Sequence, residues 1–344
     1  MVSRAPALDG GDARAWTRLA TGALKAIIGL GLLAALVVLG RIDLKALSVL
    51  GQAPAAVALC GALILLTIPL TALRWGIVLR VLGLSIPFAS LLHIVAISLL
   101  ANVFLFGPTT GDAVRGVYAW RAIGGASGRV AVSIVADRLI SLFGLLSVAL
   151  VFTLFNWHRM QQVPALAVLG TSLLLSLAIA AVVALALCLA PLSMRRVEQL
   201  VSRRPRVAER LAQLGELILL IRAQPVRLLA ACACAVAVQA LTAAAVVVIA
   251  AAIDIGSLSA ADFLFAAPLT LMANALPLTP NGIGIGEAAF DQICRWLEPA
   301  PSGAAYSSIF FAYRAISMVA WLAGLISFVV YRNEAASDPA GAQP

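Results

Sequence analysis

The sequence predicts an all-α polytopic membrane protein, with about six full transmembrane helices and two re-entrant helical hairpins arranged as an inverted repeat. Its composition is the first sign, because 62% of the 344 residues are hydrophobic and only 11% are charged. Soluble domains are nearer half apolar and a quarter charged. The second sign is a series of apolar runs close to the ~20 residues that span a ~30 Å hydrocarbon core. Eight such segments are expected, at residues 24–39, 54–73, 88–106, 130–155, 164–190, 228–253, 263–278 and 304–331.

The positions of arginine and lysine predict how these segments cross the membrane. The net charge is +9, and the basic residues cluster between apolar runs, which is typical of cytoplasmic loops and argues against a nucleic-acid partner. The basic loop at 191–227 and the N-terminus should both be cytoplasmic, yet five segments separate them. We therefore predict that segment 88–106 enters and returns on the cytoplasmic side, and that segment 263–278 does so from the opposite side. The alternative is eight full spans.

One integral membrane domain, at residues 23–331, is expected to fill most of the chain. Residues 1–22 are polar and are predicted to be a disordered cytoplasmic N-terminus, and the apolar run after them is not followed by a cleavage site. Residues 332–344 are predicted to be a disordered cytoplasmic tail. The two repeat units are predicted at residues 54–155 and 228–331, joined by the span at 164–190 and the basic loop at 191–227.

The repeat is indicated by polar residues that match between the two halves. Asn102 in "LLANVFLFGPTTGD" matches Asn274 in "LMANALPLTPNG", 172 residues later (274 − 102), and a proline follows each asparagine at the same distance. Arg138 in "VADRLISL" matches Arg314 in "FAYRAISM", 176 residues later (314 − 138). Asparagine and arginine are rare inside apolar segments, so these matches favour a duplicated unit. Inverted repeats with broken helices are typical of transporters, whose substrate sites lie near the midplane.

Two glycine- and proline-rich stretches, "GPTTGD" and "PLTPNGIGIGE", interrupt the apolar segments. Non-helical backbone at membrane depth is tolerated only where it is buried in protein or lines a wet cavity. Each stretch ends in an acid, Asp112 or Glu287, which is expected to open a short amphipathic helix. Amide groups at such a helix start can bind an anion, although capping would also explain the acids. Local ion pairs, such as Asp112 with Arg115 and Asp291 with Arg295, are expected on these helices.

Arg314 and Arg138 are the strongest candidates for a function inside the membrane. Arg314 lies ten residues into the last apolar segment, about 15 Å deep at 1.5 Å per residue. An unpaired arginine at that depth costs at least ~2.5–3.5 kcal/mol. We therefore expect Arg314 to face a partner acid or an anionic ligand. Arg138 lies nearer its helix end, and the adjacent Asp137 indicates a polar interior there.

Other kinds of chemistry find little support in the sequence. The five cysteines lie mostly inside apolar runs without a CxxC pair, and the two histidines are far apart. No disulfide framework, metal site, cofactor or catalytic residue is therefore expected. The loop "GIGIGE" has the spacing of a glycine-rich nucleotide loop, but a dinucleotide site requires a preceding strand in a βαβ unit.

These motifs together resemble the flippase-like domain family, named for the lysylphosphatidylglycerol synthase transmembrane region, over about Lys25 to Tyr331. The P-x-x-G-[DE]-x-x-R motif of the family is matched by Pro108, Gly111, Asp112 and Arg115, its [ED]-R pair by Asp137 and Arg138, and its P-x-T-P-G-G-I-G-x-x-E motif by Pro277, Thr279, Pro280, Gly282, Ile283, Gly284 and Glu287. Asn281 replaces the first glycine of the last motif, and asparagine tolerates left-handed backbone better than most residues.

The resemblance implies a lipid flippase or transporter of a bacterial-type cytoplasmic (inner) membrane. Its partners would be membrane lipids, with an anionic phospholipid or lipid-linked headgroup as substrate, and a homodimer or an associated lipid-modifying enzyme stays open. Synthase activity, which a separate soluble domain provides in lysylphosphatidylglycerol synthases, is not expected. The alternatives are a membrane-embedded transferase and a non-catalytic scaffold. The predicted transport residues are Asn102, Pro108, Gly111, Asp112, Arg115, Asp137, Arg138, Asn274, Pro280, Gly282, Gly284, Glu287 and Arg314.

Overall fold

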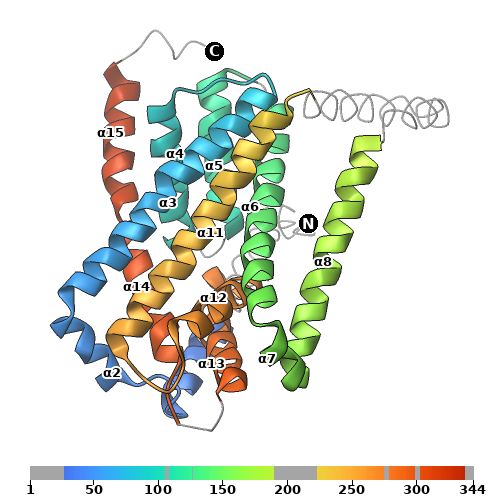
Figure 1. The fold of residues 1–344 in the computed structure, drawn as a ribbon. Coiled ribbons are helices and arrows are strands. Elements are labelled where there is room, and N and C mark those ends of the chain that lie inside the picture. Colours follow the sequence, from blue (N-terminus) through green and yellow to red (C-terminus); the bar gives the residue numbers. More distant parts are fainter. Residues whose placement is uncertain are drawn as a thin grey trace, which may run out of the picture.

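The computed structural model describes residues 27–104, 108–125, 127–189, 223–274, 279–298 and 303–337. Within these ranges every regular element is helical, as the sequence predicts (Figure 1). The predicted N-terminal region 1–22, most of the loop 191–227 and the end of the C-terminal tail lie outside the described residues. The same holds for Pro277 of the glycine-rich motif.

Four of the described helices are long and apolar enough to cross a membrane. They cover Pro54–Val81, Gly128–Phe155, Pro225–Ile253 and Ser307–Tyr331. Shorter apolar helices cover Ile27–Val38, Phe88–Val103, Pro164–Ile179 and Ala260–Asn274. All eight predicted segments thus coincide with helices. Whether the other helices cross the membrane stays a prediction.

Within each described range the helices follow one another with short connections. Those that form the centre are α3 (Pro54–Val81), α6 (Ser127–Phe155), α11 (Pro225–Ile253) and α14 (Ser307–Trp321), which α15 (Ala323–Ser337) continues. The others are α2 (Leu44–Ser48), η1 (Val49–Gln52), α4 (Phe88–Phe104), α5 (Pro108–Ile123), α7 (Trp157–Gln162), α8 (Pro164–Leu189), α12 (Ala260–Asn274), η2 (Pro280–Gly282) and α13 (Ile285–Leu297).

Proline and left-handed residues mark where the two central helices begin and end. A proline occupies the first turn of both α3 and α11, where a missing backbone N–H costs nothing. Helix α11 ends at Asp254, whose φ of 48° is left-handed. Between these limits α3 and α11 pack along each other, and α6 packs against α11 on another side (Figure 1). These three helices form the framework that carries the candidate site.

Two antiparallel helix pairs enter this framework from opposite ends. Helices α4 and α5 pack together, and their outer ends lie at the end of the molecule where α6 begins (Figure 1). Helices α12 and α13 pack together as well, and their outer ends lie at the opposite end, where α14 begins (Figure 1). We call these pairs the first hairpin (α4–α5) and the second hairpin (α12–α13). They are the two segments that the sequence predicts to turn back.

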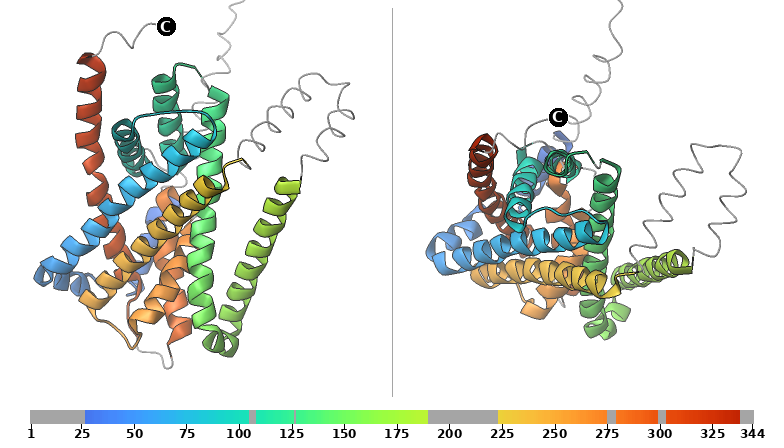
Figure 2. Two further views of the ribbon diagram at one scale, coloured as in Figure 1. Left: turned by 45° about the horizontal axis from the view of Figure 1, so that its top comes forward. Right: turned by 90° about the horizontal axis from the view of Figure 1, so that it is seen from above.

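The remaining helices surround the framework. Helix α15 packs against α4, and α14 packs against α3. Helix α8 contacts α6, α7 and α13 and lies at the edge of the bundle (Figure 2). Many large apolar side chains remain exposed on the outside, such as Val38 at 85% and Phe155 at 83%. Exposed apolar surface on this scale is expected for a protein whose outer face meets lipid.

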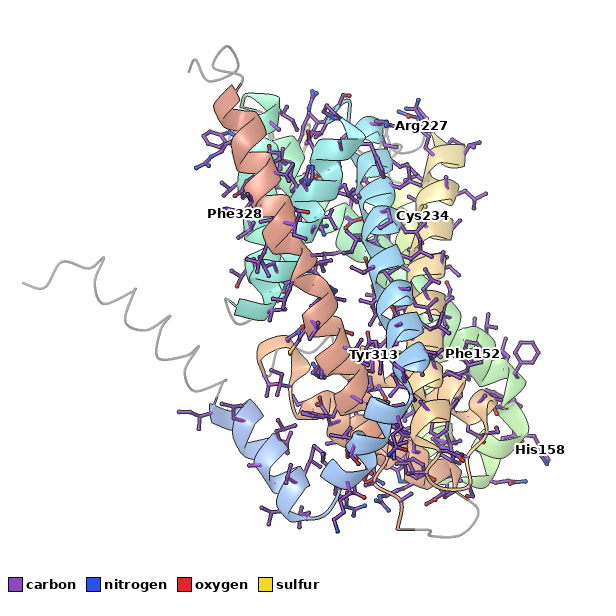
Figure 3. The ribbon with its side chains drawn as sticks, turned by 90° about the vertical axis from the view of Figure 1, so that its left-hand side faces the viewer. Phe152, His158, Arg227, Cys234, Tyr313 and Phe328 are labelled. Carbon is purple, nitrogen blue, oxygen red and sulfur yellow. The ribbon has the colours of Figure 1, made fainter. Side chains whose placement is uncertain are left out.

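Charged residues differ between the two ends of the bundle. The end of α3, the end of α5 and the starts of α6 and α11 lie at one end, which we call the basic end because it carries Arg80, Arg121, Arg129 and Arg227. The opposite end carries Asp43, Asp254, Asp262 and Glu298 together with Arg41, Lys45 and Arg295, and we call it the acidic end because acids are more frequent there than at the basic end. Figure 3 shows Arg227 at the basic end and His158 at the acidic end.

Candidate functional site

Arg314 forms a buried ion pair with Glu287, which joins α14 to the first turn of α13. Its Nε lies 2.6 Å from Oε1 of Glu287, and its Nη2 lies 3.4 Å from Oε2. Glu287 is completely buried, and Arg314 is 7% exposed. The expectation that Arg314 faces a partner acid is therefore confirmed.

The same guanidinium group holds the turn of the second hairpin. It donates hydrogen bonds to the backbone oxygen of Asn281, to that of Gly282 at 3.1 Å, and to the side-chain oxygen of Asn274 at 3.3 Å. All three nitrogen atoms of the guanidinium therefore donate hydrogen bonds, to the carboxylate, to two backbone carbonyls and to a carboxamide. An arginine bound on all sides in this way has a positioning role, because its donors are already used.

Left-handed backbone lets the turn fit around Arg314. Asn281 has a φ of 52° and Gly282 a φ of 69°, so the asparagine that replaces a family glycine does adopt the left-handed geometry that the sequence allows. A side chain on Gly282 would collide with the carboxamide oxygen of Asn274. Gly284 (φ 82°) donates its N–H to Oε2 of Glu287 at 2.8 Å, so Glu287 also caps α13, as predicted.

The first hairpin carries a comparable pair. Nε of Arg138 on α6 lies 2.7 Å from Oδ2 of Asp112 on α5. This pair is more open, because the side chain of Arg138 is 49% exposed and that of Asp112 is 21% exposed. The prediction that Asp112 opens its helix is wrong, since α5 already begins at Pro108 and Asp112 lies in its second turn. The carboxylate is thus oriented toward α6 instead of capping α5.

An asparagine faces a glycine in each hairpin. The N–H of Gly111 donates to the carboxamide oxygen of Asn102 at 2.9 Å, which links α5 to α4. In the second hairpin a Cβ on Gly286 would lie 2.5 Å from the carboxamide oxygen of Asn274. Two residue pairs that the repeat predicts, Asn102 with Asn274 and Arg138 with Arg314, are thus in comparable surroundings: each asparagine lies beside a glycine, and each arginine pairs with an acid. Pro108 and Pro280 begin α5 and η2.

A second charged cluster lies between α3, α5 and α6. Asp137 accepts hydrogen bonds from Arg74 at 2.8 and 3.1 Å and from Arg115 at 2.9 Å, and all three residues are buried. The prediction of a local ion pair between Asp112 and Arg115 is wrong, because Arg115 pairs with Asp137 on α6 instead. The guanidinium of Arg115 also lies over the ring of Trp75, with its Cζ 5.0 Å from the centroid. The sequence does not identify Arg74 as part of this cluster. It lies at the end of a predicted apolar segment, where an arginine is expected in a cytoplasmic loop.

The expected local pair on α13 is present. Nε of Arg295 lies 2.7 Å from Oδ2 of Asp291, four residues earlier. Arg41, which follows the helix Ile27–Val38, contacts the same carboxylate at 3.2 Å. Asp291 thus ties the first described helix to the second hairpin near the acidic end, which is a structural role.

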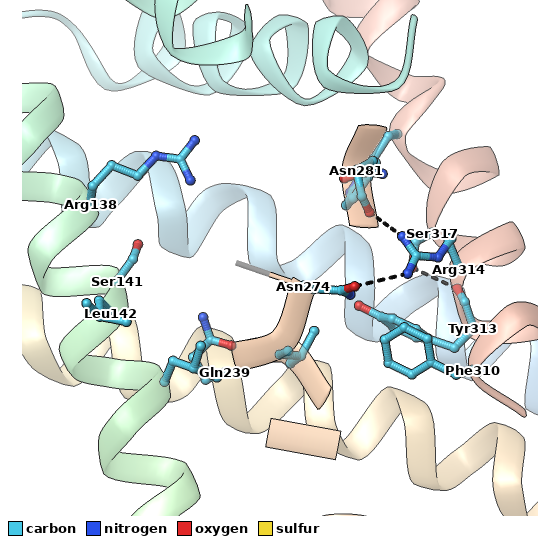
Figure 4. A pocket seen from close by; sticks show the side chains of 13 residues that line it. Arg138, Ser141, Leu142, Gln239, Asn274, Asn281, Phe310, Tyr313, Arg314 and Ser317 are labelled. Atoms are coloured by element: carbon cyan, nitrogen blue, oxygen red, sulfur yellow. Dashed lines mark hydrogen bonds between the residues drawn. The ribbon is translucent and has the colours of Figure 1, made fainter. Parts of the chain in front are cut away.

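A cavity of about 420 Å³ separates Arg138 from Arg314. Helices α6, α11, α12 and α14 and the turn η2 form its walls. Figure 4 shows the Arg138 side chain on one side, Arg314 with Asn274 and Asn281 on the other, and the Gln239 carboxamide between them. Its lining residues are Arg138, Ser141, Leu142, Leu145, Gln239, Leu271, Asn274, Asn281, Phe310, Tyr313, Arg314, Ser317 and Trp321.

The predicted residues therefore occupy three different positions. Arg138, Asn274 and Arg314 line the cavity. Asp112, Glu287, Gly282 and Gly284 contact these residues or shape their turn, while Arg115 and Asp137 belong to the separate buried cluster. Gln239 was missed, although a single carboxamide in the middle of an apolar helix is a visible signal. Among the residues that the structure describes, no group of three or more His, Cys, Asp or Glu side chains is placed to hold a metal ion.

Comparison with known proteins gives one match. The family model described as "Lysylphosphatidylglycerol synthase TM region" matches residues 23–324, nearly the whole chain. This range includes both hairpins, the cavity and every charged cluster described above. None of the curated proteins and none of the solved structures that were compared with the chain matches it.

Proposed function

Because the chain belongs to the lysylphosphatidylglycerol synthase transmembrane region family, we propose that it moves an anionic phospholipid or lipid-linked substrate between the two leaflets of a membrane. The observation that carries this proposal is the cavity between Arg138 and Arg314. Arginine suits a phosphate group because its planar guanidinium offers several donors in a fixed geometry. Inside a hydrocarbon layer, ionisable residues of this kind mark substrate pathways.

The depth of the cavity supports a pathway through the membrane. Arg138 lies eleven residues after the start of α6 (138 − 127), which is roughly 16 Å from the basic end at 1.5 Å per residue. Arg314 lies seven residues after the start of α14 (314 − 307), which is roughly 10 Å from the acidic end. Arg138 is thus the deeper of the two in its helix, and the expectation that it lies nearer its helix end is wrong, because α6 begins before the apolar run does. A headgroup that enters from either end would thus meet one arginine before the other.

The arrangement in the membrane follows from the same geometry. In this proposal the two hairpins are re-entrant, six helices span the membrane, and the units at 54–155 and 228–331 form an inverted repeat. The basic end would face the cytoplasm of a bacterial-type inner membrane, because cytoplasmic ends carry excess arginine. The helix Ile27–Val38 would then lead outward from a cytoplasmic N-terminus.

The two arginines differ in what they can offer a substrate. Arg314 is surrounded by Glu287 and the carbonyls of its turn, so it fixes the shape of the cavity. Arg138 has a half-exposed side chain and a partly exposed acid beside it. A lipid phosphate can therefore approach Arg138 with less desolvation and less rearrangement. We infer that Arg138 is the first contact of the headgroup, while Arg314 positions the opposite wall.

A transferase is less well supported. It would need one of Asp112, Asp137 or Glu287 as a general base. Each of these carboxylates accepts a hydrogen bond from at least one arginine, at 2.6–2.8 Å for the closest contact. A carboxylate bound in this way is already engaged in positioning an arginine, which gives it a structural role. A scaffold protein would have no need for arginines at this depth.

Reconstitution tests the proposal directly. The protein is placed in liposomes with a fluorescent phosphatidylglycerol, and the exchange of that lipid between leaflets is measured by chemical quenching from outside. We expect exchange to be faster than in protein-free liposomes. Arg138→Ala should slow it about tenfold or more, since a charge-assisted hydrogen bond contributes about 1.5–3 kcal/mol.

A matched control separates headgroup binding from general charge. Arg80→Ala removes an arginine from the basic end outside the cavity and should leave exchange unchanged. Arg138→Lys should retain part of the activity, because it keeps the charge without the planar group. Exchange by the wild type at the protein-free rate would rule out the transport function, and equal losses in the Arg138 and Arg80 variants would rule out the role of Arg138.

A further inference from the structure

Gln239 is a polar residue of the cavity whose presence the charged contacts do not explain. It lies fourteen residues after the start of the 29-residue helix α11 (239 − 225), in a stretch otherwise made of small and apolar residues. Its position is therefore near the middle of a helix that is apolar enough to cross a membrane. Figure 4 shows its carboxamide between Arg138 and Asn274.

The carboxamide of Gln239 has no hydrogen-bonding partner among the residues that the structure describes. A carboxamide offers two donors and an acceptor. Leaving such a group without a partner in an apolar environment costs about 1–3 kcal/mol on the evidence of protein substitutions. In a cavity at membrane depth, that cost is offset only by water or by a bound polar molecule.

The neighbouring polar groups of the cavity are differently placed. Asn274 accepts a hydrogen bond from Arg314 through its side-chain oxygen, whereas Asn281 accepts one through its backbone oxygen. Ser317 donates its hydroxyl to the backbone oxygen of Tyr313 at 2.8 Å. Thr242, which lies on α11 three residues after Gln239, donates its hydroxyl to the backbone of its own helix at 2.8 Å. Among the described residues the Asn281 carboxamide and the Ser141 hydroxyl have no partner either, and Gln239 differs from them in that its carboxamide lies between Arg138 and Asn274 (Figure 4).

We propose that Gln239 is a specificity-determining residue that hydrogen-bonds the uncharged, hydroxyl-bearing part of the substrate headgroup. This inference rests on the proposed transport function. With the phosphate at Arg138, the group attached to that phosphate lies toward the centre of the cavity, where Gln239 extends. A carboxamide can both donate to and accept from a hydroxyl. A headgroup that ends at the phosphate lacks this hydroxyl, so with its phosphate at Arg138 it leaves Gln239 without that partner.

The test compares two anionic lipids that differ only in this group. Fluorescent phosphatidylglycerol carries a glycerol with free hydroxyls, and fluorescent phosphatidic acid ends at the phosphate. Gln239→Leu removes the hydrogen-bonding atoms while keeping a similar volume. It should slow the exchange of phosphatidylglycerol about fivefold to tenfold, since one hydrogen bond is worth about a factor of this size. The exchange of phosphatidic acid should change less than about twofold.

Two further variants control this measurement. Thr242→Val removes a polar group from the same helix outside the cavity and should leave both lipids unaffected. Gln239→Asn retains the carboxamide on a shorter stem and should restore part of the preference for phosphatidylglycerol. Equal slowing of both lipids by Gln239→Leu would show a packing role, and no change for either lipid would show no role. Either result overturns the proposal.

A binding measurement keeps this inference separate from the transport function. Each of the two lipids is added to the detergent-solubilised protein, and the shift in its unfolding temperature is recorded. We expect phosphatidylglycerol to stabilise the wild type more than phosphatidic acid does, and this difference to vanish in Gln239→Leu. If the wild type exchanges neither lipid, the transport function fails. In that case the role of Gln239 in recognition is tested only by the difference between the two lipids in their shift of the unfolding temperature.

Discussion

At the scale of single residues, Arg314 and Arg138 show how the same side chain acts differently in two environments. Both pair with an acid of the neighbouring hairpin, at 2.6 and 2.7 Å. Glu287 is completely buried, whereas the side chain of Asp112 is 21% exposed. Removing one partner of a buried pair leaves an uncompensated charge and costs about 3–5 kcal/mol. An exposed pair typically contributes about 0.2–1 kcal/mol, because water replaces the lost contact.

We therefore predict that Glu287→Gln and Asp112→Asn differ strongly in stability, although both neutralise an acid. Glu287→Gln should lower the unfolding free energy by about 3–5 kcal/mol, and Asp112→Asn by no more than about 1 kcal/mol. Thermal unfolding of the two variants in the same detergent measures the difference. Equal unfolding temperatures would contradict the positioning role of the pair between Glu287 and Arg314.

The sequence predicts which residues belong to this site better than it predicts their partners. The depth of Arg314 in an apolar run predicts a partner acid or an anionic ligand, and the structure places Glu287 beside it. The partner of Arg115 could not be found in this way, because the nearest acid in sequence is Asp112, whereas Asp137 comes close only through the packing of α5 against α6. Contacts between helices depend on their relative rotation, which local spacing does not encode.

At the scale of helices, the cavity depends on a close crossing between α6 and α11. Gly144 on α6 lies against Ala235 on α11, and a Cβ added to Gly144 would be 2.6 Å from the carbonyl carbon of Ala235. Small residues at such crossings let helix backbones approach in a membrane. Arg138 lies on the same helix as Gly144, and Gln239 lies four residues after Ala235, so the crossing sets the separation of the cavity walls.

We predict that Gly144→Ala destabilises the protein, although alanine is the better helix former. The added methyl group meets backbone that cannot move aside, and overpacking of this kind costs about 1–3 kcal/mol. Gly128→Ala is the matched control in the same helix, because a Cβ there meets nothing within 4 Å. That variant should unfold at the same or a higher temperature. A higher unfolding temperature for Gly144→Ala would contradict the close crossing.

The existence of the helices could be predicted from apolar runs, but some of their boundaries could not. The acid Asp112 looks like a helix start, yet α5 begins four residues earlier at Pro108. Proline fits the first turn of a helix as well as it breaks one, so "GPTTGD" is compatible with both interpretations. In the second hairpin the glycines reduce this ambiguity, because Gly282 and Gly284 both adopt left-handed backbone, next to the left-handed Asn281.

At the scale of the whole molecule, helix length separates the two hairpins from the long helices. Helix α4 has 17 residues and α12 has 15, which correspond to roughly 26 and 22 Å at 1.5 Å per residue. Each is followed by a partner helix that returns to the end from which it came (Figure 1). Helices α3 and α11, with 28 and 29 residues, exceed the ~30 Å hydrocarbon thickness. The sequence predicts which two segments turn back, because the basic stretches of the chain before and after each of them can all be cytoplasmic only if these segments do not cross the membrane. This prediction uses no information on packing.

The orientation of the hairpins can be tested by cysteine labelling in intact cells. The five native cysteines are first replaced, and single cysteines are introduced at exposed or partly exposed positions beside each hairpin. Gly111 and Gly286 are unsuitable for this purpose, because side chains there would collide with Asn102 and with Asn274 and Arg314. Ser85 and Arg129 flank the first hairpin, and Ser257 and Ala304 flank the second.

For re-entrant hairpins, the two positions that flank one hairpin must lie on the same side of the membrane. We therefore predict that Ser257→Cys and Ala304→Cys react with a membrane-impermeant maleimide added outside, whereas Ser85→Cys and Arg129→Cys react only after the membrane is opened. The reason is that the basic end faces the cytoplasm under the positive-inside rule. With eight full spans, Ser85→Cys and Arg129→Cys would label from opposite sides, because α4 alone would separate them by one crossing. Labelling of all four positions from one side would contradict the opposite entry of the two hairpins.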